Sequence, residues 1–237
     1  TEIYTLSLHD ALPISAGGRK PLVILGARQV GKTWLMKEFG KEAYKKCAYV
    51  NFEDNDDLRG LFEHDFDIQR IIANLQWTTG VTIDEDTLII LDEIQEAPRG
   101  ITALKYFQEK APQYHVIAAG SLLGIAMHKN DSFPVGKVDF MHLYPLSFYE
   151  FLNAIGEKKM VDLLQAKDWT MLTMVRAKFE ERLRQYYFVG GMPAAVLAFV
   201  NDGDLNKVRT IQKSIIEAYE RDFSKHAPAI EVPRIRM

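Results

Sequence analysis

The sequence predicts an α/β protein with a doubly wound parallel sheet of about five strands, followed by a small, mainly helical domain. Two patterns carry this prediction. Short apolar runs alternate with helical stretches over residues 15–146, which is typical of β-α repeats with right-handed crossovers. From residue 147 onward the pattern is helical throughout. With 237 residues, of which 47% are hydrophobic, the chain can bury the core that this organisation needs.

The expected strands are apolar runs too short for helices. They lie at residues 21–25, 47–52, 88–91, 115–119 and 138–143. The first helix is expected over 32–39, with Leu35, Met36 and Phe39 on one face and Gly40 as its end. Another helix is expected to end near Lys110.

The second part of the chain is expected to hold at least four helices. Ser147 and Glu150 have the spacing of a capping box that opens a helix over 148–154. An amphipathic stretch covers 175–188, and the Gly-Gly-Met-Pro run that follows it begins the next helix. A long helix is predicted over 205–225. Its expected apolar face consists of Val208, Ile211, Ile215, Ile216 and Tyr219.

Residues 26–33 fit the pattern G-x-x-x-x-G-K-[ST], which predicts a loop that holds nucleotide phosphates. The glycines let the backbone approach phosphate, and successive N–H groups at a helix N-terminus bind its oxygens. Lys32 is expected to reach the β- and γ-phosphates as a catalytic residue, and Thr33 to be a Mg²⁺ ligand. The expected nucleotide-binding residues are Gly26, Ala27, Arg28, Gln29, Val30, Gly31, Lys32, Thr33 and Trp34.

The run 88–91 ends in two acids, Asp92 and Glu93. In open α/β sheets ligands bind at the carboxyl ends of the strands, where these side chains are expected. Asp92 is the candidate for holding Mg²⁺, and Glu93 for polarising the water that attacks the γ-phosphate. The alternative is an ordinary strand that ends in solvated acids. Because a kinase must exclude water, the acidic pair favours hydrolysis over transfer to a metabolite.

Ser121 follows the expected strand 115–119. A polar residue at the tip of that strand would lie between the phosphate loop and the acidic pair. Ser121 is therefore a third catalytic candidate, which would sense the γ-phosphate or orient the water. The alternative is a turn serine after a glycine.

The first fourteen residues are identical to a translated short-read sequencing adapter, read in one frame without a mismatch. We therefore expect residues 1–14 to be an assembly artefact without folded structure. The expected domains are then 15–146 as a nucleotide-binding core and 147–237 as a helical domain truncated at its C-terminus.

Composition excludes several other classes of protein. The net charge of −3 gives no basic excess for nucleic acid or an anionic membrane. A single cysteine, Cys47, allows no internal disulfide and no zinc site built on thiolates, and it fits a reducing, cytoplasmic location. The six histidines are scattered, and no run is long enough to span a membrane.

Together the motifs resemble AAA+-type P-loop ATPases of the additional-strand, catalytic-glutamate class. Within that class they are similar to a largely uncharacterised bacterial group that carries a C-terminal domain of unknown function. The segments that carry the resemblance are 26–33, 91–95, 120–121, 143–152 and 186–193. One departure is Gly136-Lys137, where the group usually has Gly-Arg, so a bidentate arginine contact is not expected there.

The resemblance implies a helical lid that packs over nucleotide and often supplies an arginine to the γ-phosphate. The candidates in the lid are Arg182, Arg184 and Arg221, and Arg99 in the core is considered beside them. For each, the alternative is a solvated surface charge.

The leading expectation is a Mg²⁺-dependent ATPase whose conformational change acts on an unknown macromolecular partner. ATP and Mg²⁺ are the expected cofactors, and the absence of a guanine-binding Asn-Lys-x-Asp signature favours ATP over GTP. A homo-oligomer is compatible with this expectation, nucleic acid enters by family analogy only, and no membrane partner is expected. The alternatives are a non-hydrolysing nucleotide switch or scaffold and a P-loop small-molecule kinase.

Overall fold

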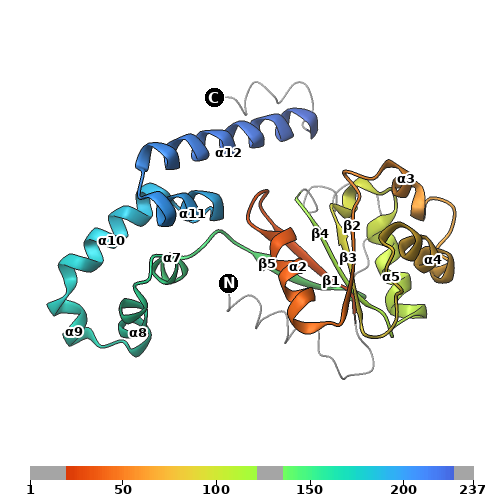
Figure 1. Cartoon of the computed structure of the whole chain (residues 1–237), viewed down its shortest axis with the longest axis horizontal. Coiled ribbons are helices and arrows are strands. Elements are labelled where there is room, and N and C mark those ends of the chain that lie inside the picture. Colours follow the sequence, from red (N-terminus) through yellow and green to blue (C-terminus); the bar gives the residue numbers. More distant parts are fainter. Residues whose placement is uncertain (1–19, 122–135, 227–237) are drawn as a thin grey trace. The chain divides into compact units, whose positions relative to one another are not determined.

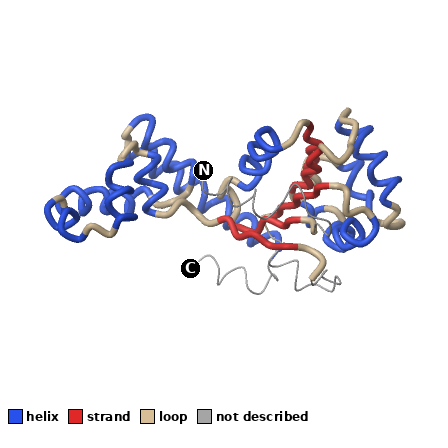
Figure 2. Tube along the Cα trace, turned by 90° about the horizontal axis from the view of Figure 1, so that it is seen from below, coloured by secondary structure: helices blue, strands red, loops and turns tan. Residues whose placement is uncertain are grey.

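The computed structural model describes residues 20–121 and 136–226, with side chains described as far as Arg221. The expectation for residues 1–14 therefore lies outside the described part. The chain divides into two compact units. Of the described residues, one unit comprises those up to Leu143 except Arg28–Val30, and the other comprises Arg28–Val30 and those from Tyr144 onward. The described strands all lie before Tyr144, and the described segment after it is helical (Figures 1 and 2).

The first unit contains a five-stranded, fully parallel sheet, as predicted. Its strands are β1 (Leu22–Gly26), β2 (Lys46–Asn51), β3 (Thr87–Asp92), β4 (His115–Gly120) and β5 (Asp139–Leu143). They stand in the order β2-β3-β4-β1-β5. Since all strands run the same way, their carboxyl ends meet at one edge of the sheet. The tip of β4 lies there between the tips of β1 and β3.

Helices cover both faces of the sheet (Figure 1). They are α2 (Lys32–Ala43), α3 (Asp56–Arg59), η1 (Gly60–Phe62), α4 (Ile68–Thr79), η2 (Ile94–Glu96) and α5 (Gly100–Lys110). Ile89 and Leu91 pack in one core with residues of α4 and α5. Leu88, one residue out of phase, lies against α2 at Gly40. All six residues of β3 are buried, as expected for a central strand covered on both sides.

The prediction that the first helix ends at Gly40 is wrong. Helix α2 continues to Ala43, and Gly40 is one of its buried residues. A Cβ added at Gly40 would collide with Cys47 Sγ on β2. The glycine therefore serves the close packing of the helix on the sheet, not the end of the helix.

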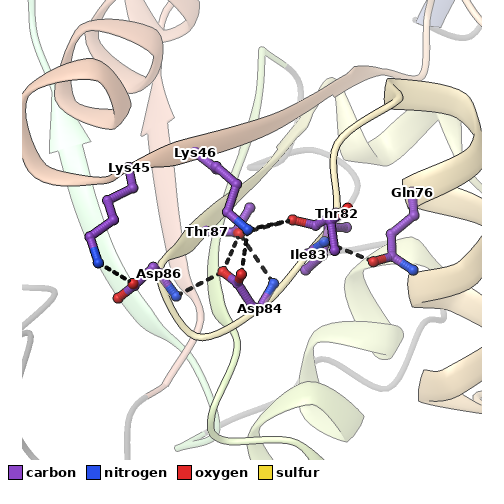
Figure 3. A network of polar contacts seen from close by, with 8 residues as sticks. All are labelled: Lys45, Lys46, Gln76, Thr82, Ile83, Asp84, Asp86 and Thr87. Carbon is purple, nitrogen blue, oxygen red and sulfur yellow. Dashed lines mark hydrogen bonds and ion pairs between the residues drawn. The ribbon is translucent and has the colours of Figure 1, made fainter.

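A polar network ties the amino-terminal ends of β2 and β3 together (Figure 3). Lys46 Nζ donates to the Thr82 carbonyl at 3.0 Å and pairs with Asp84. Thr87 Oγ1 donates to Asp84 Oδ1 at 2.8 Å and accepts from the Asp84 backbone N–H at 3.1 Å. The loop before β3 is thus anchored to the neighbouring strand.

The second unit consists of packed helices. They are α7 (Phe148–Ala154), α8 (Lys158–Ala166), α9 (Trp169–Met174), α10 (Arg176–Val189), α11 (Pro193–Asp202) and α12 (Leu205–His226). The capping box at Ser147 and Glu150 is confirmed, with both reciprocal bonds formed. The main core of this unit gathers Phe151, Val189, Val196 and Val208.

One prediction for the long helix is wrong. Val208 and Ile215 are buried on α12, as expected, but Ile216 is 58% exposed. Ile215 and Ile216 are adjacent and hence about 100° apart on a helix, so only one of them can face the centre of the core. No helix in the described residues is long and apolar enough to cross a membrane.

Candidate functional site

The phosphate loop connects β1 to α2, as the motif requires. β1 supplies a short buried run, and the loop then passes through left-handed conformations at Gln29 (φ 62°) and Gly31 (φ 100°). Gly31 is the N-cap residue of α2, and no described side chain caps the helix there. The first N–H groups of α2 are therefore placed to bind an anion, helped by the positive end of the helix dipole.

Lys32 is buried, with 5% of its surface exposed. Its Nζ donates to the carbonyl oxygens of Gly26 at 3.0 Å and Ala27 at 2.9 Å. The ammonium group is thus held along the loop that it belongs to. This places a positive charge beside the backbone N–H groups, which is the arrangement that phosphate oxygens require.

Thr33 and Asp92 meet between the start of α2 and the end of β3. Thr33 Oγ1 donates to Asp92 Oδ2 at 2.6 Å, although the two residues are 59 positions apart in the chain. Burial raises the pKa of Asp92, which is 2% exposed, while the hydrogen bond from Thr33 lowers it in part. A hydroxyl and a carboxylate so placed are the hard oxygen ligands that Mg²⁺ prefers.

The small number of protein ligands around Asp92 suits Mg²⁺. Among the described residues there is no cluster of three or more His, Cys, Asp or Glu side chains that could hold a metal ion alone. Mg²⁺ in nucleotide sites is held by one or two protein groups together with substrate phosphates and water. The pair Thr33 and Asp92 matches that requirement.

Tyr49 on β2 is a site residue that the sequence reasoning missed. Its hydroxyl donates to Asp92 Oδ2 at 3.2 Å, and Lys37 Nζ lies 3.5 Å from the centre of its ring. Burial, followed by the negative charge of Asp92, raises the pKa of Tyr49 well above its usual value. Tyr49 therefore remains a proton donor to the carboxylate at neutral pH. The sequence pattern gave no signal for this contact, which depends on β2 being next to β3.

Glu93 stands directly after β3 in a left-handed backbone conformation, with φ 49°. A non-glycine residue in this region is strained, and such strain is concentrated at functional sites. Glu93 Oε2 accepts hydrogen bonds from the Ser121 backbone N–H and from Ser121 Oγ, each at 3.1 Å. It also accepts one from Gln95 Nε2 at 2.6 Å.

Ser121 lies where the sequence reasoning placed it, at the tip of β4. Its backbone N–H and its hydroxyl both donate to Glu93, so Ser121 orients the acid. Trp34, the last residue of the expected nucleotide-binding set, is 52% exposed on the first turn of α2. Gln95 is the second residue whose role the sequence reasoning missed.

Each of the arginines proposed as candidates for contacting the γ-phosphate has a hydrogen-bond or ionic partner elsewhere in the structure. Arg99 donates to the Glu63 carbonyl at 2.7 Å, and its guanidinium lies over the Phe66 ring. The closest ionic or polar partners of the others are Glu157 for Arg182 at 2.9 Å, Glu180 for Arg184 at 4.0 Å and the Glu217 carbonyl for Arg221 at 3.2 Å. Lys137, at the position where the resembling group has arginine, pairs with Glu109 at 3.2 Å.

A parallel sheet of this order, with a phosphate loop after β1 and an acidic pair after β3, defines a P-loop nucleotide-binding protein. The family comparison gives the finer assignment. Residues 18–152 match the model of the AAA domain, which covers more than half of the chain, so the protein belongs to the AAA domain family. Residues 180–237 match a domain of unknown function, DUF8612. No curated protein matches the sequence.

Among similar solved structures, one reaches a TM-score above 0.5 and supports the fold. The Walker-type ATPase PABY2304 of Pyrococcus abyssi is similar over 99% of this chain and 75% of its own length, with a TM-score of 0.52 and 16% identity. PCH-2 of C. elegans gives a TM-score of 0.47 at 13% identity, over 92% of this chain and 67% of its own. Drosophila ORC bound to DNA gives a TM-score of 0.47 at 13% identity, over 98% of this chain and 72% of its own. At 16% identity, the similarity to PABY2304 concerns the fold alone.

Proposed function

We propose that this protein binds ATP together with Mg²⁺ at the carboxyl edge of its sheet and hydrolyses it. The observation that carries the proposal is the position of Glu93, an oriented carboxylate next to the pair formed by Thr33 and Asp92. A phosphate site needs only the loop and the lysine. A carboxylate held beside the metal-binding pair supplies what hydrolysis needs in addition, which is a base for water.

Each residue of the site has a role in this proposal. The loop N–H groups and Lys32 bind and neutralise the β- and γ-phosphates, while Thr33 and Asp92 hold the metal. When bound, Mg²⁺ supplies charge neutralisation to the phosphate oxygens. Glu93 accepts the proton of the attacking water, and Ser121 keeps the carboxylate turned toward the phosphate end of the site.

We further propose that the energy of hydrolysis is used for a conformational change of the helical residues 147–226, which acts on a macromolecular partner. Support comes from the AAA domain assignment together with the separate helical core of the second unit. The candidate partners are a second copy of this chain and, by family analogy, a nucleic acid.

The experiment is ATP binding and turnover by the whole chain, with Mg²⁺ and with EDTA, beside Lys32→Ala. We expect Mg²⁺-dependent phosphate release by the parent, and loss of both binding and turnover in Lys32→Ala. A parent that binds ATP without releasing phosphate would favour the nucleotide switch. A folded parent that does not bind ATP would contradict the proposal.

A further inference from the structure

Glu93 is held by side chains from two different elements. Ser121 follows β4, whereas Gln95 lies on the short helix η2 directly after β3. The contact from Gln95 is the shorter one, 2.6 Å from Nε2 to Glu93 Oε2, against 3.1 Å for each donor of Ser121. Gln95 belongs neither to the phosphate-loop motif nor to the acidic pair.

The backbone that carries Gln95 is rigidly placed. Its neighbour Ile94 is fully buried, and η2 is closed by backbone hydrogen bonds from Glu96 to Glu93 at 2.9 Å and from Ala97 to Ile94 at 3.2 Å. Gly100 then approaches so closely that an added Cβ would lie 2.9 Å from both Ile94 Cγ1 and Ile94 O. The amide of Gln95 is therefore delivered to Glu93 from a fixed position.

The orientation of the amide also points to this contact. Gln95 Oε1 is buried and has no hydrogen-bond partner among the described residues. A buried acceptor without a partner is rare in folded proteins and calls for an explanation. Turning the amide over would place Oε1 against the carboxylate, oxygen against oxygen, because only the NH₂ group can donate. The side chain thus keeps an unfavourable carbonyl position in order to donate to Glu93.

We propose that Gln95 is a positioning residue for hydrolysis. By donating to Glu93 Oε2 it acts with Ser121 to restrict the rotation of the carboxylate, so that Oε1 is presented to the attacking water. The proton of the water passes to Oε1 as its oxygen bonds to the γ-phosphorus and the bond to the leaving ADP oxygen breaks. This inference rests on the proposed function.

The test is steady-state ATP hydrolysis by Gln95→Met, which keeps the length of the side chain and removes its donor. We expect kcat to fall by about 10-fold to 100-fold, the loss typical of a misplaced catalytic group, while KM and ATP binding stay within about twofold. Gln108→Met is the matched control. Gln108 lies on α5 and also has a buried Oε1 without a partner among the described residues, but it is not bonded to Glu93.

A double-mutant cycle separates positioning from a merely structural role. In a Glu93→Gln background, the change Gln95→Met should alter kcat by less than about twofold, because the carboxylate that it positions is already gone. If Gln95→Met does not fold, Gln95→Leu is used in its place, since it also lacks a donor and adds no charge beside Glu93. Thermal unfolding of each variant checks that it is folded.

The outcomes distinguish the inference from the proposed function. If the parent hydrolyses ATP, Glu93→Gln lowers kcat by about 10²-fold and a folded Gln95 variant keeps full kcat, the inference is wrong and the function stands. An equal loss from Gln95→Met in the parent and in the Glu93→Gln background also overturns it. A parent without turnover overturns both.

Discussion

Gly100 connects the packing of the first unit to the candidate site, and Gly100→Ala tests that connection. The residue begins α5 and is buried against η2, the turn that carries Glu93 and Gln95. An added Cβ would lie 2.9 Å from two atoms of Ile94 and 3.3 Å from Ala97 Cβ. Because one of the two atoms of Ile94 is its carbonyl oxygen, the backbone of η2 itself must move to accommodate the methyl group.

The expected cost follows from two opposing effects. Overpacking of a core typically costs about 1–3 kcal/mol. Alanine is more favourable than glycine inside a helix by about 0.8–1.0 kcal/mol, and the first position of α5 gains at most that amount. The net destabilisation is then about 1 kcal/mol, which lowers Tm by about 2–4 °C in a chain of this size. Turnover should fall several-fold, since η2 carries the groups around Glu93.

The assay is thermal unfolding beside ATP turnover, with Gly60→Ala as the matched control. A Cβ at Gly60 would meet only Glu63 Oε2, at 3.9 Å, so this variant should keep the Tm and turnover of the parent. If Gly100→Ala behaved like Gly60→Ala in both measurements, η2 would not be held by this contact, and the rigid placement of Gln95 would lose its support.

Two further changes test other parts of the structure. In Gly191→Ala the new methyl group would overlap the Leu146 carbonyl oxygen and break the 2.7 Å hydrogen bond from the Leu146 N–H to the Gly191 carbonyl. We expect the free energy of unfolding to fall by about 2 kcal/mol or more and proteolysis of the helical unit to become faster. An unchanged digestion pattern and Tm would contradict this. Burial raises the pKa of Asp92 in the folded state. The protonated carboxyl therefore contributes to the free energy of unfolding at low pH, and this contribution is lost as pH rises through the raised pKa. In EDTA without nucleotide, the Tm of Asp92→Asn relative to the parent should therefore be highest near neutral pH and decline as pH falls, and a difference that grows toward acid pH would refute the assignment.

Much of the fold could be predicted because local patterns and the global structure agree. Short apolar runs became parallel strands, of which β3 and β4 are buried throughout, and the glycine-rich motif followed the first strand into a helix. The capping box at Ser147 and Glu150 needs only its own four residues, so sequence alone was enough. The position of Ser121 at the edge shared with Glu93 followed from the general rule that parallel strands end together.

The errors and omissions depend on tertiary contacts. Gly40 has the local signature of a helix end, but Cys47 from another strand requires a glycine in mid-helix. The bond from Tyr49 to Asp92 exists because β2 pairs with β3 in the register that sets Asn51 opposite Asp92, and no pattern within β2 specifies that register. Gln95 turns toward Glu93 because η2 is a tight turn. The local sequence around Gln95 does not reveal that turn.

The central claim is that Glu93 is the base for water in ATP hydrolysis. The most direct measurement is kcat for ATP and ATP affinity in Glu93→Gln, beside Glu96→Gln as a control with the same chemical change at the end of η2. The account predicts that Glu93→Gln binds ATP like the parent and loses about 10²-fold or more in kcat, while Glu96→Gln keeps both. Undiminished turnover by Glu93→Gln would contradict the account, because another group would then have to activate the water.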